Sequence, residues 1–275
     1  MTLATLSEVL QPALAGGYAV AGVVVLGWED ARAYVAAAEA QNAPLILQAG
    51  PGCRAHTPLP VLGAMFRHLA EGASVPVVAH LDHGYQVEEC RAAIAAGFTS
   101  VMYDGSKLSL EDNIATTKEI ADLARSAGVS IEGEIGYVGY DAGAESRGTD
   151  PAEAARFAAE TGVDAMAISI GNVHLQQTQS AAVDFDLLRA IEAATDVPLV
   201  LHGSSGIPVD VRRQLATQHK ICKFNVGTEL RQVFGAALRA ELEAHPDQFD
   251  RVALLKPLEA PIQAAAEQVI AALKA

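Results

Sequence analysis

Basic residues are scarce in this sequence of 275 residues: 19 Lys and Arg stand against 33 Asp and Glu, which gives a formal net charge of −14. A protein that binds nucleic acid needs a basic face against the phosphate backbone. This charge balance therefore argues against nucleic acid as a partner.

The sequence also lacks an apolar run approaching the roughly 20 residues that span a bilayer. Its first residues, Met1 to Gln11, contain no basic segment followed by an apolar one, so we expect no secretory signal. Three cysteines, Cys53, Cys90 and Cys222, are an odd number at unpatterned spacings, which indicates reduced thiols rather than a disulfide framework. We expect a cytoplasmic protein with no membrane partner.

Neither a Pro/Gly/Ser-rich linker nor a change of composition divides the chain. A Gly-rich phosphate-binding turn after the first predicted strand is missing too, because Leu26-Gly27-Trp28-Glu29 stands there. This absence argues against the runner-up fold, an open doubly wound sheet. We therefore expect residues 1–275 to form one domain.

What the sequence does contain is a regular alternation of short apolar, β-branched runs with longer alanine-rich stretches at helical spacing. This pattern is typical of parallel strands joined by crossover helices. Eight such units predict an α/β fold, the (β/α)8 TIM barrel, with an additional helix at the C-terminus. The predicted strands are Ala19–Leu26, Pro44–Ala49, Pro76–Leu81, Ser100–Tyr103, Ser130–Ile135, Ala165–Ile170, Pro198–Leu201 and Cys222–Val226. The predicted helices include Val87–Ala96, Leu110–Ala127, Pro151–Thr161, Phe185–Ala194, Pro208–Gln218, Thr228–Ala244 and Pro257–Ala275.

Three histidines, His83, His174 and His202, follow three different predicted strands. In this fold catalytic groups come from the C-terminal ends of the strands, so the three side chains are expected to converge. Three imidazoles that leave an open coordination position are a common catalytic zinc arrangement. No local spacing such as His-Glu-x-x-His supports the site, and the alternative is that each histidine is an isolated polar residue at a strand end.

Carboxylates lie at the same level of the predicted barrel. Asp82 is next to His83, so on an extended segment their side chains point in opposite directions, and both reach one site only if the strand has ended there. A carboxylate beside a metal-bound substrate is well placed for proton transfer, whereas the alternative role is an acceptor that orients a ligand histidine. The second role fits Asp104, Glu132 and Glu134 better, and strand alternation puts Glu132 and Glu134 on one face.

Two late segments predict a cradle for an anion. Gly203-Ser204-Ser205-Gly206 leads into the helix predicted near Pro208, and Asn225-Val226-Gly227-Thr228 leads into the next helix. Loops after strands seven and eight, together with a helix N-terminus, are the usual phosphate site of this fold. Either segment alone is equally compatible with a plain turn.

Five segments carry a resemblance to a known enzyme family. They are Pro76 to Gly84 (PVVAHLDHG), Ser100 to Ser106 (SVMYDGS), Glu132 to Gly136 (EGEIG), Leu199 to Gly203 (LVLHG) and Asn225 to Leu230 (NVGTEL). Together they resemble the class II, metal-dependent ketose-bisphosphate aldolases, the fructose- and tagatose-bisphosphate aldolase family. The similarity runs in the same order from about Tyr18 to Arg231.

The resemblance implies a role for each matching position. His83, His174 and His202 are similar to the three zinc ligands, and Glu134 to an acidic residue that helps to hold the metal. Asp82 is similar to the residue that exchanges a proton with the substrate hydroxyl at the bond being cleaved. One zinc ion per subunit, or another divalent metal in its place, is the implied cofactor, and the resemblance leaves a monovalent cation open as a further one.

The anion cradle also has a counterpart in the family. Gly203 to Ser205 and Asn225 to Thr228 match the segments that hold the phosphate and the enediolate portion of dihydroxyacetone phosphate. Retro-aldol cleavage leaves negative charge on the ketone fragment, which a zinc ion stabilises as a Lewis acid. Because family members are commonly dimers or tetramers, the resemblance implies a homodimer or homotetramer.

Several substrate-contact positions depart from the family pattern. Val24 stands where an asparagine is usual, the usual Gln-x-Ser segment reads Gln48-Ala49-Gly50, and Leu175 replaces the glycine after the second zinc histidine. Each hydrogen bond lost to a charged substrate group is worth about 1.5–3 kcal/mol. We therefore expect a specificity that differs from that of the usual bisphosphate enzyme.

The loop after the fifth strand departs as well. The family usually has two glycines followed by two acidic residues, of which the second is a proton-transfer glutamate. This chain reads Gly139-Tyr140-Asp141-Ala142, so the glutamate is missing. Asp141 and Glu145 are the candidates to replace it.

The sequence predicts a zinc-dependent class II aldolase, a lyase of carbohydrate metabolism. It would cleave or form a carbon–carbon bond of a phosphorylated ketose through an enediolate, giving dihydroxyacetone phosphate and an aldehyde. Two alternatives stay open. One is a noncatalytic homologue that binds metal and sugar phosphate, motivated by the missing loop glutamate, and the other is an isomerase or different lyase that shares the enediolate.

Overall fold

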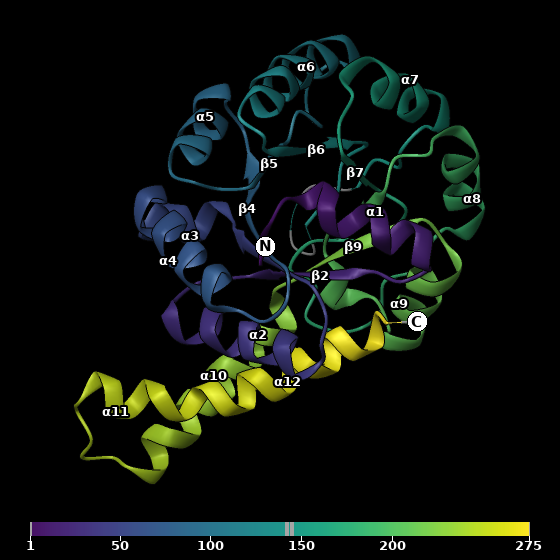
Figure 1. Cartoon of the computed structure of the whole chain (residues 1–275). Helices are drawn as coiled ribbons and strands as arrows, with labels where there is room; N and C mark the ends of the chain where they lie inside the picture. The colour runs from purple at the N-terminus through teal and green to yellow at the C-terminus, as the bar shows by residue number, and fades with distance from the viewer. Residues whose placement is uncertain (1, 141–142, 144–145, 275) are drawn as a thin grey trace.

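The computed structural model describes residues 2–140, 143 and 146–274, and within them eight parallel strands close into a barrel surrounded by helices (Figure 1). Each strand from β2 to β9 pairs with its neighbour in sequence, and β9 pairs with β2 to close the ring. The predicted TIM barrel with an additional C-terminal helix is confirmed. The strands are β1 (Leu3–Ala4), β2 (Val20–Val24), β3 (Leu45–Ala49), β4 (Val77–Gly84), β5 (Ser100–Tyr103), β6 (Ser130–Ile135), β7 (Ala165–Ile168), β8 (Leu199–Leu201) and β9 (Ile221–Val226).

The helices form the outer layer of the barrel, close one of its ends and build a C-terminal extension. They are α1 (Leu6–Gly16), α2 (Trp28–Ala40), α3 (Pro51–His56), α4 (Leu59–Gly72), α5 (Val87–Ala95), α6 (Leu110–Ser126), α7 (Pro151–Thr161), α8 (Phe185–Ala194), α9 (Val209–Gln218), α10 (Thr228–Ala244), α11 (Arg251–Leu255) and α12 (Glu259–Ala272), with short 3-10 helices η1 (Ser204–Gly206) and η2 (Lys256–Leu258). Local capping sets several of the boundaries. Helix α7, for example, begins at Pro151 because Asp150 Oδ1 accepts hydrogen bonds from the amides of Ala152 and Glu153.

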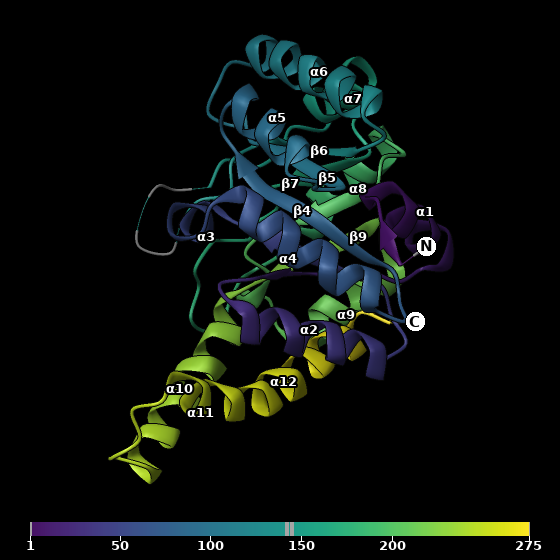
Figure 2. The same cartoon turned by 60° about the vertical axis from the view of Figure 1, so that its left-hand side comes forward.

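The N-terminal segment closes the bottom of the barrel, a feature that the sequence pattern did not predict. Strand β1 pairs with the start of β4 at Val77 and Val78, which β5 does not reach. Helix α1 then covers that end of the barrel (Figure 2). Its Leu6 and Leu10 are fully buried against barrel-interior residues such as Met102, so the closed end is apolar and the open end is left for the site.

The largest difference from the predicted strands is at the end of β4. This strand was expected to end at Leu81, but it continues to Gly84 with a register shift in its pairing to β5. The shift coincides with a left-handed backbone at His83, whose φ is +52°. Asp82 and His83 both line the same cavity because of this irregularity, so the expectation that both reach it only past the strand end was wrong.

The C-terminal helix was expected to be continuous from Pro257 to Ala275. Instead, η2 precedes α12, and α12 packs along α2 on the flank of the barrel. Helices α10 and α12 lie side by side and project from the barrel with α11 at their tip (Figures 1 and 2). We call the part from α10 to α12 the arm.

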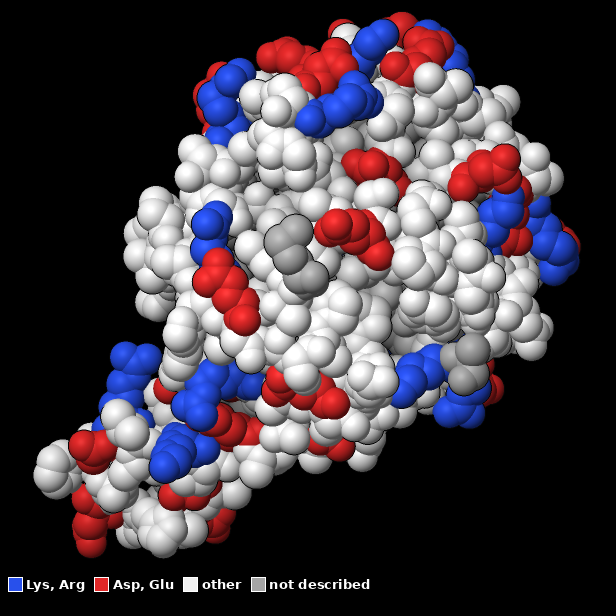
Figure 3. Space-filling model, in the orientation of Figure 1, with Lys and Arg blue, Asp and Glu red and all other residues white. Residues whose placement is uncertain are grey.

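The structure bears on three expectations drawn from the composition. On the face shown in Figure 3, Lys and Arg are interspersed with Asp and Glu and form no continuous basic patch. Cys53, Cys90 and Cys222 are free and buried, and burial raises the pKa of their thiols to about 11, 12 and 12. Among the described helices, none combines the length and the apolar character that a bilayer span requires.

Candidate active site

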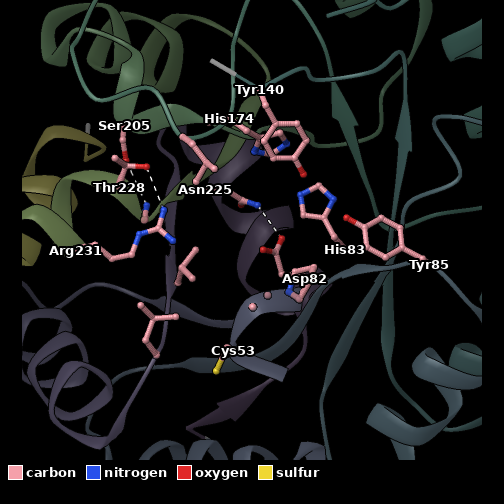
Figure 4. Close-up of a pocket in the computed structure, with 18 residues that line it drawn as sticks. Cys53, Asp82, His83, Tyr85, Tyr140, His174, Ser205, Asn225, Thr228 and Arg231 are labelled. Carbon is pink, nitrogen blue, oxygen red and sulfur yellow. Dashed lines mark hydrogen bonds between the residues drawn. The ribbon is translucent and has the colours of Figure 1, made fainter. Parts of the chain in front are cut away.

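A cavity of about 350 Å³ opens at the carboxyl ends of the barrel strands (Figure 4). Its lining comes from the last residues of β2, β4 and β9 and from segments that follow β2, β3, β4, β6, β7, β8 and β9, so distant parts of the chain meet there. The predicted residues Asp82, His83, His174 and Asn225 all line it. His202 is next to them and fully buried.

The three histidines predicted to bind metal lie together. Their ring centroids are 5.1 Å apart for His83 and His174, 4.6 Å for His83 and His202, and 5.6 Å for His174 and His202. One nitrogen from each lies within 4.8 Å of the other two. The arrangement is compact enough for all three rings to share one ion.

Carboxylates fix the orientation of two of these rings. His83 Nδ1 lies 2.9 Å from Asp104 Oδ2, and His202 Nε2 lies 3.0 Å from Glu132 Oε1. A carboxylate accepts the ring N–H, so the opposite nitrogen of each ring keeps its lone pair. Those nitrogens, His83 Nε2 and His202 Nδ1, face each other at 3.0 Å.

Two facing lone pairs repel unless a proton or a metal ion lies between or beside them. The charges around His83 also favour positive charge at this place. Burial lowers its pKa, but the carboxylates of Asp82, Asp104 and Glu134 outweigh burial and raise the pKa to about 9. Glu134 Oε2 is buried without a hydrogen-bond partner among the described residues and lies 3.6 Å from His202 Nδ1. Three imidazole nitrogens and an unpartnered carboxylate oxygen fit a divalent metal ion.

Buried charges beneath the histidines support Glu132. Lys223 Nζ lies 2.7 Å from Glu132 Oε2 and 3.4 Å from His80 Nε2, and His80 Nδ1 lies 2.8 Å from Ser100 Oγ. All four side chains are almost completely excluded from solvent. Since Lys223 engages one oxygen of Glu132, the other oxygen is held toward His202.

The third histidine is positioned by the loop after β6. The His174 amide donates to the Gly139 carbonyl at 2.8 Å, and the Tyr140 ring stacks on the His174 ring with centroids 5.0 Å apart. Burial, followed by the charge of His83, lowers the pKa of His174 to about 4. His174 is therefore a neutral ring at neutral pH, which is the form that binds metal.

Asp82 points into the cavity beside the histidines (Figure 4). Its Oδ1 accepts hydrogen bonds from Gln48 Nε2 and Asn225 Nδ2, both at 3.1 Å. Its Oδ2 faces Gly50, where a Cβ would lie 3.4 Å away. The two amides thus hold one oxygen, and the other oxygen is available to a ligand in the cavity.

The two segments predicted to hold an anion lie only in part at the cavity. Gly203, Ser205, Gly227 and Thr228 line the cavity, and Ser205 Oγ accepts from the Gly227 amide at 3.3 Å. Two predicted members do not line it. The Ser204 hydroxyl donates instead to the Leu201 carbonyl at 2.8 Å. The Val226 side chain is packed in the core, because it follows Asn225 in β9 and alternate residues of a strand face opposite sides.

The family model described as "Fructose-bisphosphate aldolase class-II" matches residues 4–275. The chain belongs to this family. Among similar proteins, the 6-phospho-5-dehydro-2-deoxy-D-gluconate aldolase of Shouchella clausii is 37% identical, over 98% of this chain and 94% of that protein. The protein of the same name from Bacillus subtilis is 35% identical, over 94% of this chain and 90% of its own length.

Solved structures agree with this assignment. The YdjI aldolase from Escherichia coli K12 superposes with a TM-score of 0.86 at 32% identity, covering 98% of this chain and 97% of that one. A putative fructose-1,6-biphosphate aldolase from Coccidioides immitis gives a TM-score of 0.83 at 25% identity, covering 98% and 95%. The protein is thus an aldolase, a lyase of a family that depends on divalent metal ions, and the resemblance inferred from the sequence is confirmed.

In this class II aldolase, the positions that depart from the family pattern lie at the cavity. Val24 and Leu175 both line it. Leu175 has a φ of +60°, a left-handed conformation that glycine adopts without strain. The backbone shape expected of a glycine is therefore kept, and an apolar side chain, 52% exposed, is added at the mouth. The candidate replacements for the loop glutamate, Asp141 and Glu145, lie outside the described residues.

Arg54 supports the backbone of this aldolase site and was not predicted from the sequence. Its guanidinium donates to the carbonyls of Ala49, Asp82 and His83 at 2.8, 2.6 and 2.9 Å. It thereby ties the end of β3 to the irregular end of β4. No sequence signal marked it, because an arginine in a short helix is normally a surface residue.

Replacing Arg54 with methionine is expected to lower the free energy of unfolding by about 2–4 kcal/mol, since part-buried carbonyls lose a charged donor. Denaturant unfolding measures this change. Arg125→Met is the matched control, because Arg125 is 63% exposed and pairs with Asp122 on the surface; an exposed pair contributes at most about 1 kcal/mol. Equal effects of the two substitutions would contradict the role of Arg54.

Proposed function

We propose that this aldolase cleaves, and in reverse forms, a carbon–carbon bond of a phosphorylated ketose, giving dihydroxyacetone phosphate and an aldehyde. The observation that carries the proposal is the meeting of three imidazoles and the Asp82 carboxylate at one cavity. We assign His83, His174 and His202 as ligands of a zinc ion, with Glu134 beside them. When bound, the ion supplies Lewis-acid polarisation of the substrate carbonyl.

Asp82 moves the proton in the proposed reaction. In the cleavage direction, its Oδ2 accepts the proton of the hydroxyl on the carbon of the breaking bond that lies farther from the substrate carbonyl. That carbon becomes the aldehyde, the carbon–carbon bond breaks, and its electron pair remains on the ketone fragment as an enediolate. Gln48 and Asn225 hold Oδ1 in place. Oδ2 therefore accepts the proton in cleavage and donates it in the reverse reaction.

The enediolate carbon must then gain a proton to leave as dihydroxyacetone phosphate. We propose that Asp141 or Glu145, in the loop after β6, supplies it. The support is Tyr140, the described residue that precedes Asp141 in sequence, which lines the cavity and stacks on His174. Variants Asp141→Asn and Glu145→Gln would separate the two candidates by their rates of proton exchange.

The phosphate of the ketone fragment is proposed to bind at Gly203, Ser205, Gly227 and Thr228. Gly203 has a φ of +64°, and a Cβ there would lie 2.2 Å from the Val173 carbonyl oxygen, so only glycine fits. Backbone amides near a helix N-terminus favour an anion. The same two segments also contain Ser204, Val226 and Asn225. Ser204 and Val226 do not line the cavity, and Asn225 donates a hydrogen bond to Asp82.

The names of the two curated relatives suggest the first substrate to test, 6-phospho-5-dehydro-2-deoxy-D-gluconate. Its carbonyl at C5 and hydroxyl at C3 place the retro-aldol bond between C3 and C4. Cleavage there gives dihydroxyacetone phosphate and 3-oxopropanoate. The apolar Val24 and Leu175 at the cavity support a substrate other than the usual bisphosphate.

The test is a coupled assay of dihydroxyacetone phosphate with the zinc-loaded protein and a panel of ketose phosphates, including this compound and fructose 1,6-bisphosphate. We expect the keto-acid phosphate to react with the highest kcat/KM. Cleavage of fructose 1,6-bisphosphate at an equal kcat/KM would overturn the proposed specificity. Proton exchange on dihydroxyacetone phosphate with no cleavage of any ketose would instead favour an isomerase or another lyase.

We also propose a homo-oligomer, a dimer or tetramer, built from a single-domain subunit. The arm supports this, because it projects from the barrel and exposes apolar side chains, with Phe249 93% and Val252 69% exposed. Light scattering coupled to size exclusion is expected to give a mass of two or four subunits. A monomer at micromolar concentration would contradict it.

A further inference from the structure

Arg231 is a cationic residue at the cavity that the proposed function leaves without a role. It lies in the first turn of α10 and is the one Lys or Arg among the described residues that line the cavity. Its Nη2 lies 3.2 Å from Thr228 Oγ1, and a Cβ placed on Gly227 would be 3.6 Å from the same nitrogen. The guanidinium is therefore at the anion cradle.

No carboxylate among the described residues forms an ion pair with Arg231. The acid nearest in sequence, Glu229, is engaged by Arg212 through two contacts of 2.6 and 3.1 Å. Burial is the main influence on Arg231 and lowers the pKa of its guanidinium, whereas the Tyr34 phenol acts in the opposite direction. A partly buried cation without a counter-charge is stabilised when an anionic ligand provides one.

The charged residues and the histidines lie at different sides of the cavity. Figure 4 shows Arg231 beside Thr228 and Ser205 on one side, His83 on the other, and Asp82 with Asn225 between them. A phosphate ester that brings its dianion to Arg231 thereby directs its other end toward the histidines. Because the whole chain carries a net charge of −14, a local cation is needed to attract such a ligand.

We propose that Arg231 selects phosphorylated ligands, by pairing its guanidinium with the phosphate held at Ser205, Gly227 and Thr228. The fork of an arginine suits two phosphate oxygens, whereas a lysine presents a single point charge. This inference rests on the proposed function for the orientation of the substrate. The binding of phosphate itself is a separate property that needs no turnover.

The experiment is isothermal titration of inorganic phosphate into the zinc-loaded full chain and its variants. Arg231→Gln is expected to weaken phosphate binding about 10- to 100-fold, because a charge-assisted contact is lost. Arg231→Lys is expected to weaken it less, because it keeps the charge but not the fork. Arg239→Gln is the matched control: Arg239 is exposed on the same helix and lines the neighbouring cavity. It is expected to change the dissociation constant less than about twofold.

Unchanged phosphate binding by both Arg231 variants would overturn the proposal. An equal loss in Arg239→Gln would overturn it too, because the effect would then belong to the general charge of the helix. Thermal unfolding confirms that each variant is folded, and Arg231→Lys keeps the test valid if the glutamine variant is not. If the wild type binds phosphate but cleaves no ketose phosphate, the proposed reaction fails while the assignment of Arg231 stands.

Kinetics provide a second readout if the wild type cleaves a ketose phosphate. Arg231→Gln is expected to raise KM about 10- to 100-fold for the phosphorylated substrate and to leave KM for its dephosphorylated analogue unchanged. An equal rise in KM for both compounds would contradict phosphate selection by Arg231. A merely structural role would not discriminate between the two compounds.

Discussion

Asp82→Asn is expected to lower kcat for ketose phosphate cleavage by about 10²- to 10⁴-fold, the range that a positioned acid or base contributes. The asparagine oxygen can still accept from Gln48 and Asn225, whose amide nitrogens lie 3.1 Å from Asp82 Oδ1. The new NH2 group takes the place of Oδ2 and cannot accept the proton of the substrate hydroxyl. Shape and amide contacts are therefore kept, and only proton transfer is lost.

Metal content, unfolding temperature and the kcat of a control variant make this result specific to proton transfer. Metal content and unfolding temperature of Asp82→Asn are expected to match those of the wild type, so that the loss lies in the chemical step. Asp122→Asn is the control, because its side chain is 64% exposed and distant from the cavity lining. Retention of more than a tenth of wild-type kcat by Asp82→Asn would assign the proton transfer to another group.

Removing the metal is expected to abolish turnover. The substitution His174→Ala is expected to weaken metal binding by at least about 100-fold. Residues that only support a ligand typically change metal affinity by about 10- to 100-fold. His174 is the best of the three proposed ligands to replace, because it lies outside the buried network of Glu132 and Lys223. Its loss removes one of three nitrogens and leaves the barrel interior intact. Activity after chelation should return when zinc is added back.

Metal analysis after dialysis and competition with a chromophoric chelator measure this affinity directly. Bound metal also raises the unfolding temperature, since it binds the native state, and this increase should shrink in His174→Ala. His68→Ala is the control, because His68 is an exposed histidine that stacks on Trp28 away from the cavity. A wild-type metal affinity in His174→Ala would remove this ring from the site.

The barrel and the place of its site were predictable from local sequence features. Alternating strand and helix periodicity predicts a closed parallel barrel, and such a barrel presents its strand ends at one mouth. The face of a strand on which a side chain lies was also predictable where the strand is regular. Glu132 and Glu134 alternate along β6, and both lie close to His202, at 3.0 and 3.6 Å.

Other features could not be predicted because they depend on departures from regular geometry. Asp82 and His83 both line the cavity because His83, inside β4, has a left-handed backbone. No residue type in this segment predicts that conformation. The N-terminal helix α1 was not predicted, because its position depends on contacts with the interior of the closed barrel rather than on local sequence. The ion pair of Lys223 with Glu132 joins strands 91 residues apart in sequence.

The sequence by itself determined the fold, the family and the residue types available at the mouth of the barrel, because these follow from periodicity and from short motifs. Only the tertiary structure decided which of those residues meet. His83 and His202 are 119 residues apart, and their nitrogens come to 3.0 Å because barrel closure aligns their strands. Arg54 reaches the end of β4 for the same reason: contacts between separate elements, rather than the local pattern, set the direction of its side chain.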